Sequence, residues 1–352
     1  MANARSIEMK QPAPAPSAPP PESPTTQRLT EVGLDWAMRY GLLILLGLVV
    51  LFFATYSKTS GTYLSHANLV SLVGNQAVVS IVAMAALVPL TAGYIDLSCG
   101  AVTGVSSIVC AALLSKAHTS TVEAVALGIL AGLLLGAVNG VLIARFKLSS
   151  IIATLGTSTA LTGGMLWYTK GTTIGSNLPA GFTSFGSLNW LGVPRVAFVM
   201  VPVLLICWFL LENTPFGRYL QAVASNRRSA HLVGIPVDRA AFAAFLLSGL
   251  LAGIAGVLLT ARSGAADSTT GPSYLFPALT AVFLGATAIH PGRPNMWGTT
   301  IGIFFIAFAL SGLSLMGAST WAPDLFNGVT LVVAASLASI FARRRGGGPR
   351  LF

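Results

Sequence analysis

Long apolar runs recur along the chain, and most are close to the length that crosses a bilayer. A transmembrane helix needs about 20 mostly apolar residues. Ten such runs are expected, at Ala37–Tyr56, Leu69–Ala92, Gly100–Ser115, Val122–Ala144, Ile151–Tyr168, Val196–Leu211, Ala240–Ala261, Tyr274–Ile289, Met296–Met316 and Leu325–Ala342. The pattern predicts an all-α polytopic membrane protein with about ten transmembrane helices and a transmembrane domain over residues 36–342.

The composition agrees with this class of protein. The mean hydropathy is +0.77, and charged residues are 9% of the 352 residues. A water-soluble domain carries about 25% charged residues. Since so few charges cannot cover a soluble surface, lipid is the expected solvent for most of the chain.

The positive charges predict an orientation. If there are ten spans and both termini are cytoplasmic, 15 of the 20 basic residues face the cytoplasm and 5 face outward. Such a bias is typical of membrane proteins. An odd number of spans would place Arg343–Arg345 outside, against the bias. The basic residues are scattered at the ends of apolar runs, so we expect contact with membrane lipid and none with nucleic acid.

Both ends of the chain are expected to be tails. Seven prolines lie between Gln11 and Pro24. Because proline has no backbone amide to donate in a helix and the segment has few apolar side chains to bury, this composition is typical of disorder. We therefore expect a proline-rich, disordered cytoplasmic tail over residues 1–30. Residues 343–352 are predicted to form a basic cytoplasmic tail.

The longest polar interruption is the segment 212–239. Its pattern predicts one short helix over Phe216–Ser225 and a second over Arg227–Val233, with Asn226 as the N-cap residue of the second. Gly234 would end that helix. A basic segment of this kind suits a docking surface for a partner, or a solvated loop that its charge keeps on the cytoplasmic side. Both interpretations remain open.

A second segment interrupts an apolar run near residues 89–100. Pro89 and Gly93 predict a broken helix, and Asp96 follows as the only acid between residues 36 and 122. A carboxylate at membrane depth is costly unless it has a polar partner or a water-filled cavity. Asp96 and Ser98 would then form a hinge or gate beside a substrate path. Alternatively, Asp96 caps the next helix in a tight cytoplasmic turn.

Other residues suggest how the spans pack and what they enclose. Gly132, Gly136 and Gly140 share one helix face, and Gly249 and Gly253 share another, so both faces are predicted to pack helix on helix. The three cysteines, Cys99, Cys110 and Cys207, are expected to be buried thiols. The candidate residues of a translocation path or gate are Gly93, Asp96, Ser98, Asn75, Gln76, Asn139, Thr154 and Thr157.

Several motifs resemble one transporter family. Gly93-Tyr-Ile-Asp-Leu-Ser-Cys-Gly100 is similar to the Gly-Gly-Ile-Asp-Leu-Ser-Val-Gly signature of ribose/xylose-type sugar permeases of ABC transporters, which belong to the branched-chain amino acid/sugar permease family. Asn139-Gly140, Ser150-Ile-Ile-Ala-Thr-Leu-Gly-Thr157 and Thr214-Pro-Phe-Gly-Arg218 resemble its further motifs. The resemblance covers about residues 65–340. The chain departs from the pattern at Tyr94, where the family has a second glycine.

The resemblance implies a function and a set of partners. It implies the permease subunit of an ATP-driven importer in the bacterial inner membrane, with no cofactor of its own. The implied partners are a separate ATP-binding cassette subunit, a periplasmic or lipoprotein sugar-binding protein, and a second permease copy or paralogue. The segment 212–239 would dock into the ATP-binding subunit through Arg218, Asn226, Arg227, Arg228, Ala230, Gly234 and Ile235.

The chain carries no catalytic motif that we recognise. It has no GxxxxGK[ST] phosphate loop, no HExxH and no GxSxG motif, so it is not expected to be an enzyme or to hold a metal. The alternative function is an ion-coupled secondary transporter or channel for a small neutral solute. Such a carrier needs ionisable residues inside its spans, and the predicted spans contain only Arg39 and Glu123, near their ends. A neutral sugar or polyol is the expected substrate.

Overall fold

The computed structural model describes residues 24–117 and 119–344. The chain divides into two units, residues 1–37 and 38–352. Helix α1 begins at Pro24, inside the segment predicted to be a disordered tail. Residues 1–23 of that segment, and residues 345–352 of the predicted basic tail, lie outside the described residues.

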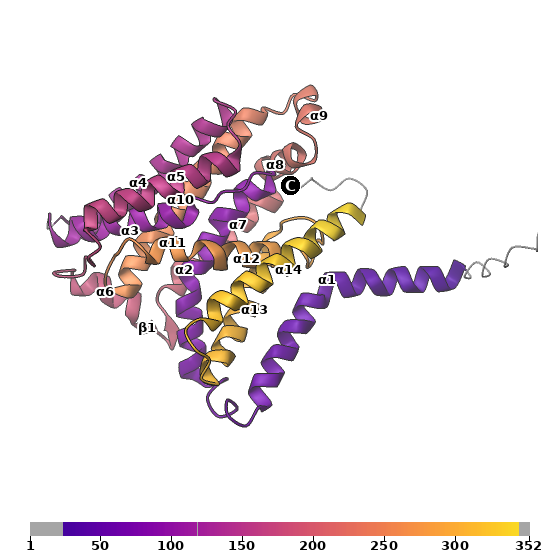
Figure 1. Ribbon diagram of the computed structural model, residues 1–352, viewed down its shortest axis with the longest axis horizontal. Coiled ribbons are helices and arrows are strands. Elements are labelled where there is room, and N and C mark those ends of the chain that lie inside the picture. Colours follow the sequence, from indigo (N-terminus) through magenta and orange to yellow (C-terminus); the bar gives the residue numbers. More distant parts are fainter. Residues whose placement is uncertain (1–23, 118, 345–352) are drawn as a thin grey trace, which may run out of the picture. The chain divides into compact units, whose positions relative to one another are not determined.

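The described residues are mostly helical, which confirms the predicted all-α class apart from one short hairpin (Figure 1). In chain order the elements are α1 Pro24–Thr55, α2 His66–Thr91, α3 Cys99–Ser115, α4 Thr121–Ala144, α5 Ser150–Thr169, α6 Ala180–Ser187, β1 Asn189–Trp190, β2 Val193–Pro194, α7 Ala197–Trp208, the π-helical turn η1 Phe209–Asn213, α8 Pro215–Ser225, α9 Arg227–Leu232, α10 Val237–Ser263, α11 Thr270–Ser273, α12 Leu275–Gly285, α13 Met296–Leu315 and α14 Ala322–Arg344.

The protein is a multi-pass membrane protein, but the predicted number of ten spans is not confirmed. Within the described ranges, five helices are long and apolar enough to cross a bilayer: α2, α4, α10, α13 and α14. A sixth span results if α7 with η1 and α8, which are bent by 64°, count as one. Helix α5 has the length, but its many threonines and glycines dilute its hydropathy, and α12 has only 11 residues.

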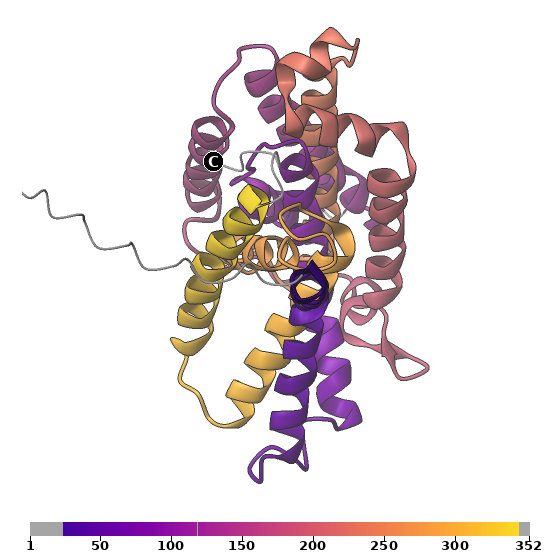
Figure 2. The same cartoon turned by 90° about the vertical axis from the view of Figure 1, so that its right-hand side faces the viewer.

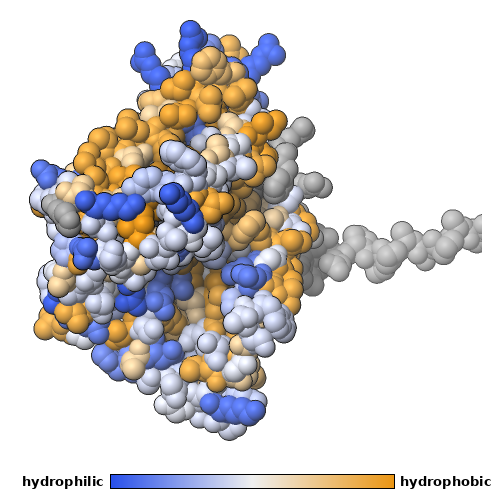
Figure 3. All heavy atoms as spheres, turned by 60° about the vertical axis from the view of Figure 1, so that its left-hand side comes forward, coloured by the Kyte–Doolittle hydropathy of each residue, from blue (hydrophilic) through white to orange (hydrophobic). Residues whose placement is uncertain are grey.

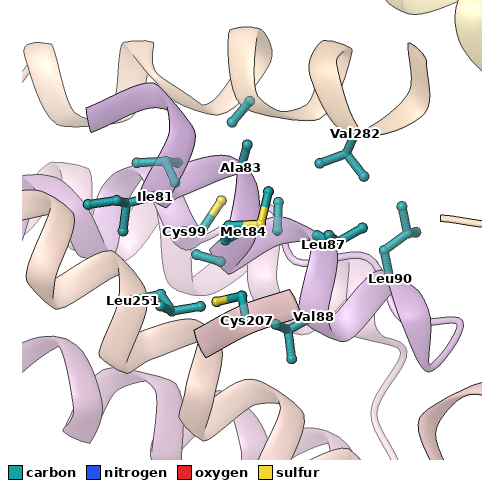
Figure 4. Close-up of a cluster of buried hydrophobic side chains, with 14 of the residues drawn as sticks. Ile81, Ala83, Met84, Leu87, Val88, Leu90, Cys99, Cys207, Leu251 and Val282 are labelled. Atoms are coloured by element: carbon teal, nitrogen blue, oxygen red, sulfur yellow. The ribbon is translucent and has the colours of Figure 1, made fainter. Parts of the chain in front are cut away.

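Helix α2 runs through the apolar core. Its side chains are buried almost without interruption from Ala77 to Thr91, as expected for a helix that is apolar on all sides. Figure 4 shows its residues Ile81, Met84 and Leu87 among side chains from α3, α7, α10 and α12. Cys99, Cys110 and Cys207 are all buried and free, which confirms the prediction of buried thiols.

Helix α10 packs on α4 through glycines that leave no room for a side chain; the two helices lie side by side in Figure 1. A Cβ atom on Gly132 would lie 2.5 Å from the Cα of Gly253, and one on Gly136 would lie 2.5 Å from the carbonyl oxygen of Phe245. The predicted helix-on-helix role of the glycine faces is therefore confirmed. In lipid, such close backbone approach replaces the hydrophobic drive that joins helices in water. We call this contact the glycine seam.

Strands β1 and β2 form a short antiparallel hairpin. In Figure 2 this hairpin lies beside α7, on the side opposite α14. Loops lie at the same end of the fold. Ile174 and Ala266 form an antiparallel bridge between the loops that follow α5 and α10. Beside this bridge, Asp267 accepts hydrogen bonds from the amide and hydroxyl groups of Thr269 and Thr270. Partial burial raises the pKa of this carboxyl, but the hydrogen bonds prevail and lower it to about 2.

Candidate functional site

The predicted broken helix is present. Helix α2 includes Pro89 and ends at Thr91, and α3 begins at Cys99. Between them Gly93 takes a φ of +76°, a conformation that favours glycine. A Cβ atom on Gly93 would also lie 3.4 Å from the Cα of Ala224 in α8. We call residues 92–98 the break segment.

The carboxylate of Asp96 is held by three neutral donors. The amide and the hydroxyl of Ser98 donate to its Oδ1, at 2.9 and 2.6 Å. The hydroxyl of Ser248 in α10 donates to its Oδ2 at 2.7 Å. The capping interpretation is met only in part: Asp96 accepts the amide of Ser98, but Ser98 itself is the N-cap residue of α3, which begins at Cys99. Asp96 is only 3% exposed, so these bonds replace the water that the charge would otherwise need.

The hydrogen bonds continue from Asp96 to two further helices. Asn139 in α4 donates through Nδ2 to the hydroxyl oxygen of Ser98 at 2.7 Å. Thr157 in α5 donates to Oδ1 of Asn139 at 2.8 Å. Each of these residues donates to the next one, from Thr157 through Asn139 and Ser98 to Asp96. This Asp96 network therefore joins the break segment, α4, α5 and α10.

Side chains of α5 also satisfy the backbone of the break segment. The amide of Leu97 donates to Oγ1 of Thr154 at 3.0 Å, and the amide of Ile95 donates to the hydroxyl oxygen of Ser150 at 3.3 Å. Backbone outside a helix is tolerated at membrane depth only when its polar groups find such partners or line a cavity. Helix α5 therefore positions the break segment as well as the Asp96 network.

The structure thus brings together six of the predicted path residues: Gly93, Asp96, Ser98, Asn139, Thr154 and Thr157. Ser248 and Ser150 were not among the predicted path residues. Ser248 could have been found as one of two hydroxyl residues, with Thr260, in the apolar run Ala240–Ala261, where a buried polar group needs a partner.

Asn75 and Gln76 lie elsewhere. Asn75 is 16 residues before Thr91 in α2, a rise of roughly 24 Å along the helix. Its Oδ1 accepts a hydrogen bond from the guanidinium of Arg262 at 3.0 Å, at the far end of α10. The same guanidinium donates to the carbonyl oxygen of Gly186 at 3.2 Å. These two predicted path residues therefore do not belong to the Asp96 network.

The predicted pair of short helices in the segment 212–239 is present as α8 and α9. The side chain of Asn226 accepts the amide of Ser229 at 3.0 Å and caps α9 as expected. Gly234 has a φ of +86° and follows the end of the helix. Helix α9 is one residue shorter than predicted. We call α8 and α9 together the basic segment.

The predicted docking residues fall into two groups. Arg218, Arg227 and Arg228 are exposed. Ala230 is only 4% exposed and packs in the protein's own core, and Ile235 packs against the same core. Their side chains hold the basic segment on the rest of the chain, so the expectation that Ala230 contacts a partner directly is not consistent with its burial.

A pocket of about 540 Å³ adjoins α8. It lies between α8, the end of η1 and the turn that joins α12 to α13. Its polar and charged lining residues are Thr91, Glu212, Arg218, Gln221, Ser225, His290, Arg293 and Asn295. Arg218 thus shares a concave surface with a second arginine from a distant part of the chain.

The apolar helices, the break segment and the exposed basic segment define a polytopic α-helical membrane protein built for transport. Residues 68–335 match the family described as "Branched-chain amino acid transport system / permease component". The chain belongs to this family, and it is a translocation subunit rather than an enzyme. No solved structure matches the chain significantly.

Its relatives include three permeases of known systems. The ribose import permease protein RbsC of Bacillus subtilis (strain 168) is 36% identical over 83% of this chain and 90% of its own length. The L-arabinose ABC transporter permease protein AraH of Azospirillum brasilense is 30% identical, over 82% and 85%. The autoinducer 2 import system permease protein LsrD of Escherichia coli O9:H4 (strain HS) is 32% identical, over 76% and 82%.

Proposed function

We propose that this chain is the membrane-spanning subunit of an ATP-driven importer that moves a neutral sugar or polyol. A separate ATP-binding subunit powers it, and an external binding protein delivers the substrate. The observation that carries the proposal is the chemistry of the Asp96 network, which consists of hydroxyl and amide groups around a single carboxylate. Such groups can exchange hydrogen bonds with the hydroxyls of a passing sugar. The names of two of the relatives, which state ribose and L-arabinose, agree with this class of substrate.

The basic segment would dock on the ATP-binding subunit. Arg227 and Arg228 would donate to acidic groups there. Beyond them, Leu232 and Val233 are 78% and 76% exposed, and neighbouring exposed apolar side chains of this kind would suit a contact with a partner. Figure 3 shows hydrophilic side chains along the upper edge of the molecule, the edge that carries α9 in Figure 1. Basic side chains beside exposed apolar ones would fit a cleft of the ATP-binding subunit that has acidic residues at its edge.

The pocket beside α8 would provide a second point of contact. Arg218 and Arg293 line it from different elements, with His290 beside them. Two guanidinium groups in a concave surface suit a carboxylate, because each can donate two hydrogen bonds to it. We therefore place an acidic side chain of the ATP-binding subunit in this pocket.

A second permease copy would cover α5. Most of this helix is exposed, and only Ala153, Thr154, Met165 and Thr169 are buried. A Cβ atom on Gly156, Gly163 or Gly164 would meet nothing within 4 Å. Small residues allow helices to approach closely in lipid.

The proposal includes the topology in the membrane: the chain has ten spans, with both termini and the basic segment in the cytoplasm.

Charge reversal in the basic segment tests the docking. Each desolvated charge-assisted hydrogen bond is worth about 1.5–3 kcal/mol. The double variant Arg227→Glu with Arg228→Glu is expected to lose the ATP-binding subunit during purification while the permease still folds. The matched control is Arg227→Lys with Arg228→Lys, which keeps both charges and is expected to keep most of the binding. Wild-type co-purification of the charge-reversed variant would remove the basic segment from the interface.

Uptake into vesicles tests the energy source and the substrate. Vesicles that hold the permease and its ATP-binding subunit, with the binding protein outside, are expected to accumulate a sugar from a labelled panel only when ATP is inside. Uptake that survives ATP depletion and responds to a proton or sodium gradient would instead indicate a secondary transporter. Binding of the same panel to the isolated binding protein would identify the sugar.

A further inference from the structure

A ring contact joins the basic segment to the break segment. The guanidinium carbon of Arg227, the first residue of α9, lies 4.2 Å from the centre of the Tyr94 ring. This distance is within the range of a cation–π interaction, which an arginine makes more often than a lysine. Tyr94 lies two residues before Asp96. The contact therefore links an exposed charge to the segment that carries the buried carboxylate.

The other contacts of Tyr94 point into the core. Its side chain is only 6% exposed, and its ring packs edge-on against Phe245 of α10 with the ring centres 5.9 Å apart. Phe245 is fully buried and lies about one helical turn before Ser248, the residue that donates to Asp96. Tyr94 is thus held between the first residue of α9 and the helix that anchors the Asp96 network.

The backbone beside Tyr94 is also in contact with the basic segment. At Gly93 the chain passes so close to α8 that an added Cβ would touch the Cα and Cβ of Ala224, at 3.4 and 3.6 Å. Helix α8 therefore rests on the break segment itself. A displacement of α8 and α9 cannot leave residues 93 and 94 in place without breaking both contacts.

We propose that Tyr94 is the positioning residue that transmits movement of the basic segment to the Asp96 network. When the ATP-binding subunit displaces α9, Arg227 moves the Tyr94 ring, and the break segment moves with it relative to Ser248. The bonds of Asp96 then rearrange. The inference rests on the proposed docking of α9, and it adds the residue through which that docking reaches the gate.

Hydrogen exchange measured by mass spectrometry tests this role without knowledge of the sugar. The probe is ADP with vanadate, added to the permease and its ATP-binding subunit in lipid nanodiscs. Two peptides are followed. One covers α9 and reports whether the partner is docked, and the other covers residues 92–98 and reports the gate. In the wild type, both are expected to change their exchange rate when the nucleotide is added.

Tyr94→Leu removes the ring but keeps an apolar side chain. We expect protection of α9 by the ATP-binding subunit to be unchanged, and the response of residues 92–98 to the nucleotide to fall about fivefold. Tyr94→Phe keeps the ring face and is expected to retain most of the response. A purely structural role of the ring would change the amount of folded protein but not the response per folded molecule, so both quantities are measured for each variant.

A pair of arginine variants provides a second test if Tyr94→Leu folds poorly. Arg227→Gln and Arg228→Gln each remove one positive charge from α9, and the two positions lie roughly 100° apart around the helix. Both are expected to weaken docking. At nucleotide and partner concentrations that restore docking, only Arg227→Gln is expected to lack the response in residues 92–98.

The outcomes separate the two proposals. If α9 gains no protection from the ATP-binding subunit in the wild type, the docking proposal fails. If α9 is protected but residues 92–98 respond equally in the wild type and in Tyr94→Leu, docking stands and the role of Tyr94 is overturned. Loss of α9 protection in Tyr94→Leu would also overturn it, because Tyr94 would then act on docking itself.

Discussion

Helix α10 is held to its neighbours in two contrasting ways. At the glycine seam, α4 and α10 meet backbone to backbone, and Gly132 and Gly253 leave no space that a side chain could enter. At the Asp96 network, Ser248 reaches across to a carboxylate and holds it through a hydrogen bond of 2.7 Å. The seam depends on shape alone, whereas the network depends on groups that can rotate and change partners.

The contrast indicates which contact is fixed and which can move. Displacement at the seam opens a gap or creates a clash, and close-packed surfaces tolerate neither. Hydroxyl groups can turn to a new acceptor at little cost, since each donates once and accepts twice. We infer that α4 and α10 move as one body, and that the break segment moves against them.

The largest expected effect is at the seam. Gly132→Leu should cost about 3 kcal/mol or more, because the added side chain must displace the backbone of α10. The matched control is Gly47→Leu in α1, where an added Cβ meets nothing within 4 Å. Thermal unfolding in detergent measures both. Equal midpoints for the two variants would mean that the seam is not closed as described.

Asp96→Asn should have a large effect on transport and a smaller one on assembly. The amide can accept only on its single oxygen, so the three donors that now reach the two carboxylate oxygens cannot all keep an acceptor on this residue. A hydrogen bond to a charged group contributes about 1.5–3 kcal/mol. Uptake per permease molecule in the membrane should fall roughly tenfold or more. Wild-type uptake at equal abundance would remove Asp96 from the mechanism.

A smaller effect is expected at the edge of the network. Thr157→Val removes the donor to Asn139 and keeps the shape of the side chain, so the cost should be about 0.5–1.5 kcal/mol. Thr159→Val in the same helix is the control, because its hydroxyl bonds only to the carbonyl oxygen of Leu155 within α5. Uptake and thermal unfolding should change in the first variant and stay near wild type in the second.

The smallest effect is expected at Asp267, a carboxylate held by hydroxyl and amide groups in a loop. Its pKa is lowered to about 2, below the ordinary value of about 3.9. Its contribution to stability is therefore fully present above pH 4 and is lost as the pH falls through 2. Hydrogen exchange in residues 266–274 should be steady from pH 7 to 5, once corrected for the intrinsic rate. A change between pH 7 and 5 would contradict the lowered pKa.

Local features of the fold were predictable from the sequence, and long-range ones were not. The caps of α9, the break after Pro89 and the glycine faces depend on neighbouring residues. The bond from Asn139 to Ser98 joins residues 41 positions apart, and the bond from Ser248 to Asp96 joins residues 152 positions apart. No local pattern in the sequence selects these partners from the other polar residues.

Two predictions are not confirmed by the structure. The number of ten spans relied on apolar length, whereas threonines reduce the hydropathy of α5 and α12 is short. Ala230 was assigned to the docking surface because the family resemblance implies docking through this segment. One face of α9 packs on the core, and Ala230 lies on that face.

The glycine seam also has a consequence for biogenesis. Because chains are made from the N-terminus onward, α4 leaves the ribosome and enters the membrane well before α10 exists. During that interval its glycine face has no matching surface, and Asp96 lacks the donor that Ser248 later provides. Both partners are supplied by α10, Val237–Ser263. We therefore expect that the glycine face of α4 and the carboxylate of Asp96 gain these partners only when α10 has been inserted.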